Sequence, residues 1–323
     1  MTAVLALDPQ TYRCHTIHGA ERIWAETNCY VDVWIELLHA LGREPVAGLP
    51  FTLTIDFEGD QWTFFKFPLL ELYDLFGVHV QELALWRPLH LHIEEQLRRG
   101  NPVLVEVDSF YLADTAGTAY KQSHVKTTVA VVEIDVERPM VAYFHNAGFF
   151  RAEGDDVVDL LGLRGERGPH WLPPYAEFAK VGEMPHRTSA ELLQTSLALL
   201  RKHLGLVPRA NPFTQFRERL AVDLPQLMEA SLETFHLYSF ATLRQYGACY
   251  ELAATYLRWL AEQGQPELEE PTRAFSEISE SAKAFQFQLA RTMARRKPLD
   301  LAPLETMGER WERGIAALKA RYG

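Results

Sequence analysis

The sequence predicts an α+β fold, in which an N-terminal part mixes helices with an antiparallel sheet and a C-terminal part is all helical. Before about residue 165, short β-like runs alternate with short helical segments, whereas beyond about residue 186 the apolar residues follow helical spacing. A polar, proline-bearing link, GLRGERGPHWLPPYAEF, separates the two patterns. We therefore predict two domains, residues 1–165 and residues 186–323.

Composition and charge limit the class of protein. Of the 323 residues, 47% are hydrophobic and 23% are charged, which is typical of a globular chain. The net charge of −11 argues against a nucleic-acid partner. No apolar run approaches the roughly 20 residues that cross a bilayer, and the N-terminus lacks the basic start of a signal peptide. With three scattered cysteines, we expect a soluble, cytoplasmic, bacterial-type protein in a reducing compartment, without a membrane partner. The oligomeric state stays open.

The segment from Cys29 to Leu41 is the clearest helix of the N-terminal part. Its apolar residues recur at helical spacing. Thr27 or Asn28 can cap its start, and Gly42 can close its end.

The other predicted elements follow from the same rules of periodicity and turn chemistry. Shorter helices are expected at 68–76 and 88–99, and strands at 51–57, 102–108, 124–135 and 140–145. The last two strands are joined by a connection short enough for an antiparallel pair. The C-terminal helices are expected at 189–204, 224–262, 271–296 and 303–322, the second being long enough to break or bend, and a bundle would bury their apolar faces.

Cys29 is the first candidate for chemistry because it begins a predicted helix. A helix N-terminus favours a thiolate, which is the form of cysteine that attacks an acyl group. The alternative interpretation is a small buried hydrophobic residue, which is the commoner use of a lone cysteine.

His124 and Asn146 are the candidate partners of that thiol. His124 begins one predicted strand and Asn146 ends the next, so an antiparallel pair is expected to place them at one edge of the sheet. Asn146 would then accept from one ring nitrogen of His124 and leave the other to face the thiol. Alternatively Asn146 only stops a strand before a turn. His145 should point to the opposite face.

Two acidic residues have two interpretations each. Asp108 ends a predicted strand, where it either forms an Asx turn or recognises a substrate amine. Glu26 lies three residues before Cys29 and has the same two interpretations, with a plain surface residue favoured.

The order of a helix-borne cysteine, a strand-borne histidine and a strand-end asparagine resembles the papain-like cysteine fold. The runs NPVLVEVDSFYL, HVKTTVAVVEID and MVAYFHNAGFF are similar to bacteriocin-processing cysteine peptidases. They are more similar still to the N-terminal domain of the butirosin-biosynthesis acyltransferase family. The resemblance covers roughly residues 15–150, and we expect a bacterial family whose function is not established.

The resemblance implies acyl transfer from a carrier-protein thioester to an amine. Cys29 would attack the phosphopantetheine thioester, His124 would act as base, and the partner would be an acyl or aminoacyl carrier protein. The backbone N–H of Cys29 would stabilise the oxyanion, with Asn28 or Thr27 as a second donor. Papain-like peptidases usually carry a glutamine where this chain has Ile23, which favours thioester chemistry over proteolysis.

Two further functions remain open: a cysteine peptidase or amidase that uses the same residues, and a non-catalytic binding protein on a papain-like fold. The histidine pairs His15/His18 and His90/His92 lack a third ligand at a useful spacing, so we expect no metal site. No glycine-rich phosphate motif is present, so we expect no resident cofactor.

Overall fold

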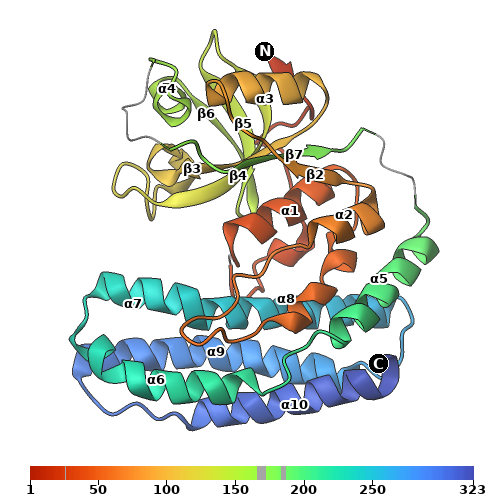
Figure 1. Ribbon diagram of the computed structural model, residues 1–323, viewed down its shortest axis with the longest axis vertical. Helices are drawn as coiled ribbons and strands as arrows, with labels where there is room; N and C mark the ends of the chain where they lie inside the picture. Colours follow the sequence, from red (N-terminus) through yellow and green to blue (C-terminus); the bar gives the residue numbers. More distant parts are fainter. Residues whose placement is uncertain (26, 166–171, 183–186) are drawn as a thin grey trace. The chain divides into compact units, whose positions relative to one another are not determined.

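The computed structural model describes residues 1–25, 27–165, 172–182 and 187–323. The chain forms two compact units (Figure 1). Unit 1 consists of residues 1–19, 28–45 and 69–186, and unit 2 of residues 20–27, 46–68 and 187–323. Each unit therefore contains segments that are not contiguous in the sequence, whereas the sequence-based boundary cut the chain once.

Unit 1 is built on one seven-stranded antiparallel sheet with the strand order β2-β7-β3-β4-β5-β6, and β1 pairs with β4 outside this path. The strands are β1 (Thr2–Ala3), β2 (His79–Glu82), β3 (Val103–Asp108), β4 (Lys126–Asp135), β5 (Met140–His145), β6 (Gly148–Glu153) and β7 (Ala176–Lys180). The predicted strands at 102–108, 124–135 and 140–145 are confirmed as β3, β4 and β5. The strands β1, β2, β6 and β7 were not predicted, and β1, β2 and β7 are brief, with 2, 4 and 5 residues.

Helices cover the sheet of unit 1. Helix α3 (Leu89–Arg98) and helix α4 (Asp155–Leu161) share one apolar core with alternate residues of β3, β4 and β5. Helix α1 (Cys29–Ala40) packs against β4, β5 and β6, and α2 (Leu69–Phe76) packs against β2. The sheet is therefore buried on both faces at its centre, which explains why β4 is buried along almost its whole length.

The register of β4 and β5 decides which residues meet at the sheet edge. Ala130 lies opposite Phe144, so Thr128 lies level with Asn146. Strand β4 has 10 residues and β5 has 6, and the start of β4 therefore extends beyond the end of β5. On its other side β4 pairs with β3, where Lys126 lies opposite Asp108.

Unit 2 is a helical unit. Its helices are α5 (Ser189–Leu204), α6 (Pro212–Glu229), α7 (Leu232–Ser239), α8 (Gln245–Glu262), α9 (Glu269–Arg295) and α10 (Ala302–Tyr322). The predicted helix at 224–262 breaks as expected: α6 ends at Glu229, and a π-helical turn over Phe240–Arg244 leads into α8. An α+β chain with an N-terminal antiparallel sheet and a helical C-terminal part is therefore confirmed.

Aromatic residues fill the core of unit 2. The Trp62 ring centroid lies 4.8 Å from that of Tyr246 and 5.0 Å from that of Phe213. The segment 20–27 joins this core through Trp24, whose indole N–H donates to Ser279 Oγ at 3.1 Å. Glu251 accepts from the backbone N–H of Ile23 at 2.6 Å and of Trp24 at 3.1 Å.

The prediction of a strand at residues 51–57 is wrong. Pro50–Thr54 form a 3-10 helix, in which the hydroxyls of Thr52 and Thr54 donate to the carbonyls of Leu49 and Phe51 at 2.6 and 2.7 Å. These local bonds replace the strand ladder that β-branched residues otherwise favour. Across the described part of the chain, no helix combines the length and apolar character needed to cross a membrane.

Candidate functional site

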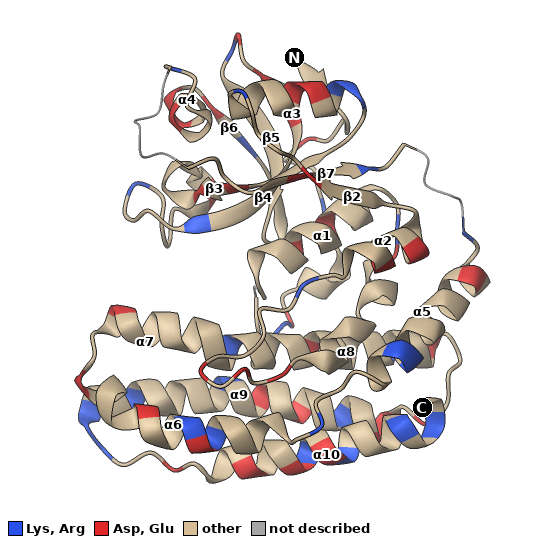
Figure 2. Ribbon diagram, in the orientation of Figure 1, with Lys and Arg blue, Asp and Glu red and all other residues tan. Residues whose placement is uncertain are grey.

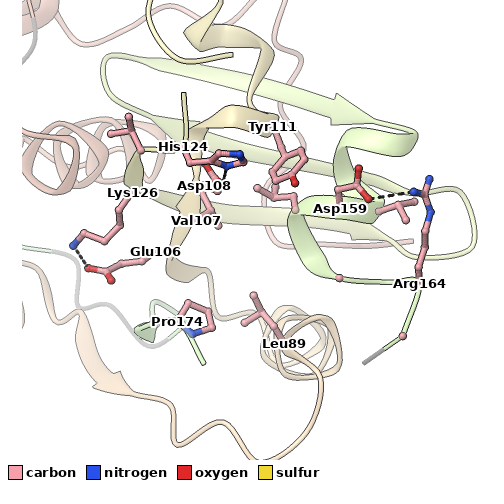
Figure 3. A pocket seen from close by; sticks show the side chains of 15 residues that line it. Leu89, Glu106, Val107, Asp108, Tyr111, His124, Lys126, Asp159, Arg164 and Pro174 are labelled. Atoms are coloured by element: carbon pink, nitrogen blue, oxygen red, sulfur yellow. Dashed lines mark hydrogen bonds and ion pairs between the residues drawn. The ribbon is translucent and has the colours of Figure 1, made fainter. Parts of the chain in front are cut away.

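The candidate site centres on a pair formed by Asp108 and His124. Asp108 is the last residue of β3 and lies opposite the first residue of β4, so the chain just before β4 passes beside it. Its Oδ2 atom lies 2.5 Å from Nδ1 of His124, and its Oδ1 atom accepts from the backbone N–H of Phe110 at 3.0 Å. The His124 ring also stacks on Phe110, with centroids 4.3 Å apart and planes inclined by 14°. Two contacts thus hold the imidazole, and Figure 3 shows the one to Asp108.

This geometry determines what the imidazole can do. When Nδ1 donates to a carboxylate, the neutral ring carries its lone pair on Nε2. A ring held in that tautomer is oriented as a general base. The His124 side chain is 66% exposed, so a substrate can reach it. Asp108 therefore makes the contact to His124 that was expected from Asn146, in addition to forming the predicted turn.

A pocket of about 820 Å³ lies beside this pair (Figure 3). Two ion pairs line it: Lys126 Nζ lies 2.6 Å from Glu106 Oε1, and Arg164 lies 3.3 Å from Asp159. Apolar residues complete the wall, among them Leu89, Val107, Leu160 and Pro174. A pocket of this size, with charged groups on an apolar wall, suits a small organic substrate.

Cys29 lies at the first position of α1, as predicted. The side-chain oxygen of Asn28 caps this helix by accepting from the backbone N–H of Val31 at 3.0 Å, and the thiol residue is partly exposed. Cys29 is not among the described residues that line the pocket of His124. Of the predicted site residues, the structure therefore brings Asp108 and His124 together. It places Cys29 outside the pocket that these two residues line.

Asn146 lies in the turn between β5 and β6 with a left-handed backbone (φ 46°). The register sets it level with Thr128, four residues from His124, which is about 13 Å along an extended strand. Asn146 is separated from His124 because the start of β4 extends beyond the end of β5. Asn146 thus occupies the strand-ending turn that was its alternative interpretation.

The remaining predicted residues have structural partners or cannot be placed. Thr27 is buried, and its backbone carbonyl accepts from Arg244 Nε at 3.0 Å within unit 2. The side-chain oxygen of Asn28 is used for the helix cap. Glu26 lies outside the described residues.

A buried polar network around the end of β5 was not expected from the sequence. His145 donates or accepts at both ring nitrogens, with Nδ1 2.5 Å from Asp114 and Nε2 2.7 Å from the Thr127 hydroxyl. The Tyr143 hydroxyl donates to the same carboxylate at 2.6 Å. Alternation along β5 puts Tyr143 and His145 on one face, as predicted for His145, but Asp114 gives no sequence signal.

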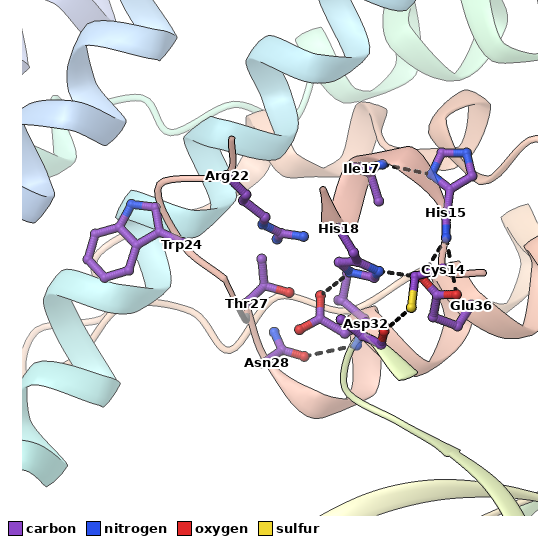
Figure 4. Close-up of polar contacts among 12 residues, drawn as sticks. Cys14, His15, Ile17, His18, Arg22, Trp24, Thr27, Asn28, Asp32 and Glu36 are labelled. Carbon is purple, nitrogen blue, oxygen red and sulfur yellow. Dashed lines mark hydrogen bonds and ion pairs between the residues drawn. The ribbon is translucent and has the colours of Figure 1, made fainter. Parts of the chain in front are cut away.

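A second missed network joins the N-terminal segment to α1 (Figure 4). The buried His18 ring contacts Glu36 through Nδ1 and lies 3.1 Å from Asp32 through Nε2. The Tyr12 hydroxyl donates to Glu36 at 2.5 Å. Asp32 and Glu36 are spaced i and i+4 on a helix that is buried almost throughout, and this spacing was the available signal.

The described residues contain no group of three or more histidine, cysteine, aspartate or glutamate side chains arranged to hold a metal ion.

Comparison with protein families identifies the chain. The DUF1839 N-terminal domain model matches residues 13–181, and the DUF1839 C-terminal domain model matches residues 189–320. The protein belongs to the DUF1839 family. The expectation of a family whose function is not established is thereby confirmed, whereas the DUF1839 matches leave the papain-like relationship as a prediction. A search of curated proteins finds no match.

Proposed function

We propose that this DUF1839 protein is an acyltransferase that moves an acyl or aminoacyl group from a phosphopantetheine thioester to an amine. His124 is the general base and Asp108 holds it. The observation that carries the proposal is the 2.5 Å contact between Asp108 and His124 beside a pocket of about 820 Å³. The similarity of the β3–β5 region to acyltransferases supports the choice of reaction, and the papain-like relationship belongs to the same proposal.

In the covalent route, Cys29 is the nucleophile, and because it lies outside the pocket of His124 this route requires the two side chains to approach each other. The Cys29 proton passes to Nε2 of His124 as the sulfur attacks the thioester carbonyl, and the phosphopantetheine thiol leaves with that proton. The acceptor amine then attacks the acyl group on Cys29 and gives a proton to His124. That proton returns to the cysteine sulfur as the bond between carbon and sulfur breaks. The position of Cys29 at the start of α1 supports this role, because helix N–H groups stabilise both a thiolate and an oxyanion.

A direct route is the second candidate. No cysteine is among the described residues that line the pocket of His124, and this favours attack by the amine without an acyl-enzyme. His124 would take the proton from the amine, and the leaving thiol would receive it. Asp108 has the same role in both routes.

The experiment measures transfer from an acyl-loaded carrier protein to an amine acceptor. Replacing His124 by Gln should lower the rate about 10²–10⁴-fold, whereas replacing the exposed His79 of β2 by Gln should leave it unchanged. An unchanged rate in the His124→Gln protein would overturn the proposal.

The Cys29→Ala protein separates the two routes. In the covalent route, intact-mass analysis of the wild-type protein detects an acyl adduct that the variant lacks, and transfer stops. In the direct route, the wild-type protein gives no adduct and the variant keeps its activity.

A further inference from the structure

A second cavity of about 540 Å³ adjoins the pocket of His124. Leu89, Gly162 and Gly165 line both spaces, so the two are neighbours (Figure 3 shows Leu89 at the wall of the first). The lining of the second cavity is mostly apolar and comes from the segment before α3, the start of α3 and the end of α4: Leu85, Trp86, Pro88, Leu161, Leu163 and Pro173 also line it.

Two buried nitrogen atoms of this lining lack a hydrogen-bond partner. They are Nε of Arg87 and Nδ1 of His90. Both side chains nevertheless line the cavity, and the Arg87 guanidinium is held there by donating from Nη2 to the Leu91 carbonyl at 3.1 Å. The cavity therefore has one fixed cationic group on a mostly apolar wall.

The charge around the cavity indicates the kind of ligand. Arg87 is cationic, and none of the described lining residues is acidic. The cavity also meets the start of α3, which has neither a side-chain cap nor an acidic residue in its first turn. Helix N–H groups at such an end favour an anion. The Arg87 guanidinium lies 5.4 Å from the centroid of the Trp86 ring. This indole is 81% exposed and offers a flat surface at the cavity.

We propose that this second cavity binds an apolar carboxylate, with the aliphatic or aromatic body against the leucines and Trp86 and the carboxylate at Arg87 and His90. In the acyl-transfer reaction the cavity would hold an apolar substrate arm that bears a carboxylate. That use rests on the proposed function, whereas the binding itself does not.

The test uses phenylacetate, phenylacetamide and acetate as probes, with binding to the full-length protein measured by calorimetry and by ligand-observed NMR. Phenylacetate should bind about tenfold more tightly than phenylacetamide, because only the acid is charged. Acetate, which lacks the apolar body, should bind at least tenfold more weakly than phenylacetate. Equal affinity for the acid and the amide would overturn the proposal.

Variants locate the binding. Arg87→Met keeps the apolar stem and removes the guanidinium, so it should reduce the affinity for phenylacetate to that for phenylacetamide. Arg98→Met at the far end of α3, where the side chain is 63% exposed, is the matched control and should change neither affinity. Leu163→Trp should fill the cavity and abolish the binding of both phenylacetate and phenylacetamide. Circular dichroism confirms that this variant is folded. Loss of phenylacetate binding in both arginine variants, or in neither, would show that binding occurs elsewhere.

The binding assay separates this proposal from the proposed function. If His124→Gln leaves acyl transfer unchanged but Arg87→Met weakens phenylacetate binding, the proposed function fails and the cavity assignment stands. If His124→Gln slows acyl transfer but Arg87→Met leaves phenylacetate binding unchanged, the cavity assignment fails and the proposed function stands.

Discussion

Asp108 orients His124 from the neighbouring strand: the carboxylate that ends β3 lies 2.5 Å from the imidazole that precedes β4. The same carboxylate accepts from Phe110 N–H through its other oxygen. One residue therefore shapes the turn and contacts the His124 imidazole.

Replacing Asp108 by Asn should keep the turn and impair the base. The amide oxygen can still accept from Phe110, but the carboxylate that accepts from Nδ1 of His124 and so favours one tautomer is lost. We expect acyl transfer to slow about 10²–10⁴-fold without loss of thermal stability. Glu106→Gln is the matched control, because Glu106 lines the pocket but pairs with Lys126, and it should cost less than about tenfold. Similar losses in both proteins would contradict the assigned role of Asp108.

The three cysteines should differ in their reaction with iodoacetamide. Cys14 is an exposed residue, yet partial desolvation of its thiol and the Glu36 carboxylate raise its pKa, and burial raises the pKa of Cys249 well above its usual value. Because the thiolate is the reactive form, a raised pKa leaves less of it near neutral pH. Cys29, partly exposed at a helix start, should therefore be labelled first.

Peptide mapping by mass spectrometry at a series of pH values checks this order. Labelling of Cys14 should continue to accelerate above about pH 9, beyond the range of an ordinary thiol. A Cys29→Ser protein is the control for peptide assignment. Equal labelling of Cys14 and Cys29 near neutral pH would disprove the prediction.

The cap of α1 can be tested at Asn28. Asn28→Ala removes the oxygen that accepts from Val31 N–H, and should lower the free energy of unfolding by about 0.5–2 kcal/mol. Asn28→Asp keeps an acceptor and adds a charge that the helix N-terminus favours, so it should stay within about 0.5 kcal/mol of the wild type. Urea unfolding measures both, and equal losses would show that the cap is not what stabilises the position.

Gly247 in α8 should not accept a side chain. A Cβ atom there would lie 2.4 Å from the Trp24 ring, which is itself held by Ser279. We expect Gly247→Ala to destabilise the protein by about 1–3 kcal/mol, despite the better helix propensity of alanine. Gly117→Ala, where a Cβ would meet nothing within 4 Å, should change stability by less than about 0.5 kcal/mol. Thermal unfolding that ranks the two variants in the reverse order would contradict this packing argument.

Periodicity predicted much of the framework. The helix expected at Cys29–Leu41 is Cys29–Ala40, and the strand expected at 140–145 has those bounds. These segments bury a regular apolar pattern, so local sequence and tertiary packing favour the same structure. At residues 51–57 they conflict, because Pro50 and the two threonine hydroxyls favour a 3-10 turn within a helical unit.

The partner of His124 shows what the sequence could not settle. Only β5 was expected beside β4, and the choice of Asn146 assumed that the start of β4 lies level with the end of β5. The overhang of β4 depends on strand lengths and on a bulge between Val131 and Glu133, neither of which the sequence specifies. Pairing β3 with β4 would have brought Asp108 to His124, since both flank the same turn region.

The bond between Ile23 and Glu251 joins residues 228 positions apart. A ribosome that adds about 5–20 residues per second needs roughly 10–45 s to complete that interval. During this time the segment 20–27 has left the exit tunnel while most of the helical unit that holds it has not yet been made. During synthesis, Trp24 and its neighbours therefore stay exposed to solvent for a long interval. The nascent chain should depend on chaperones that bind exposed aromatic segments.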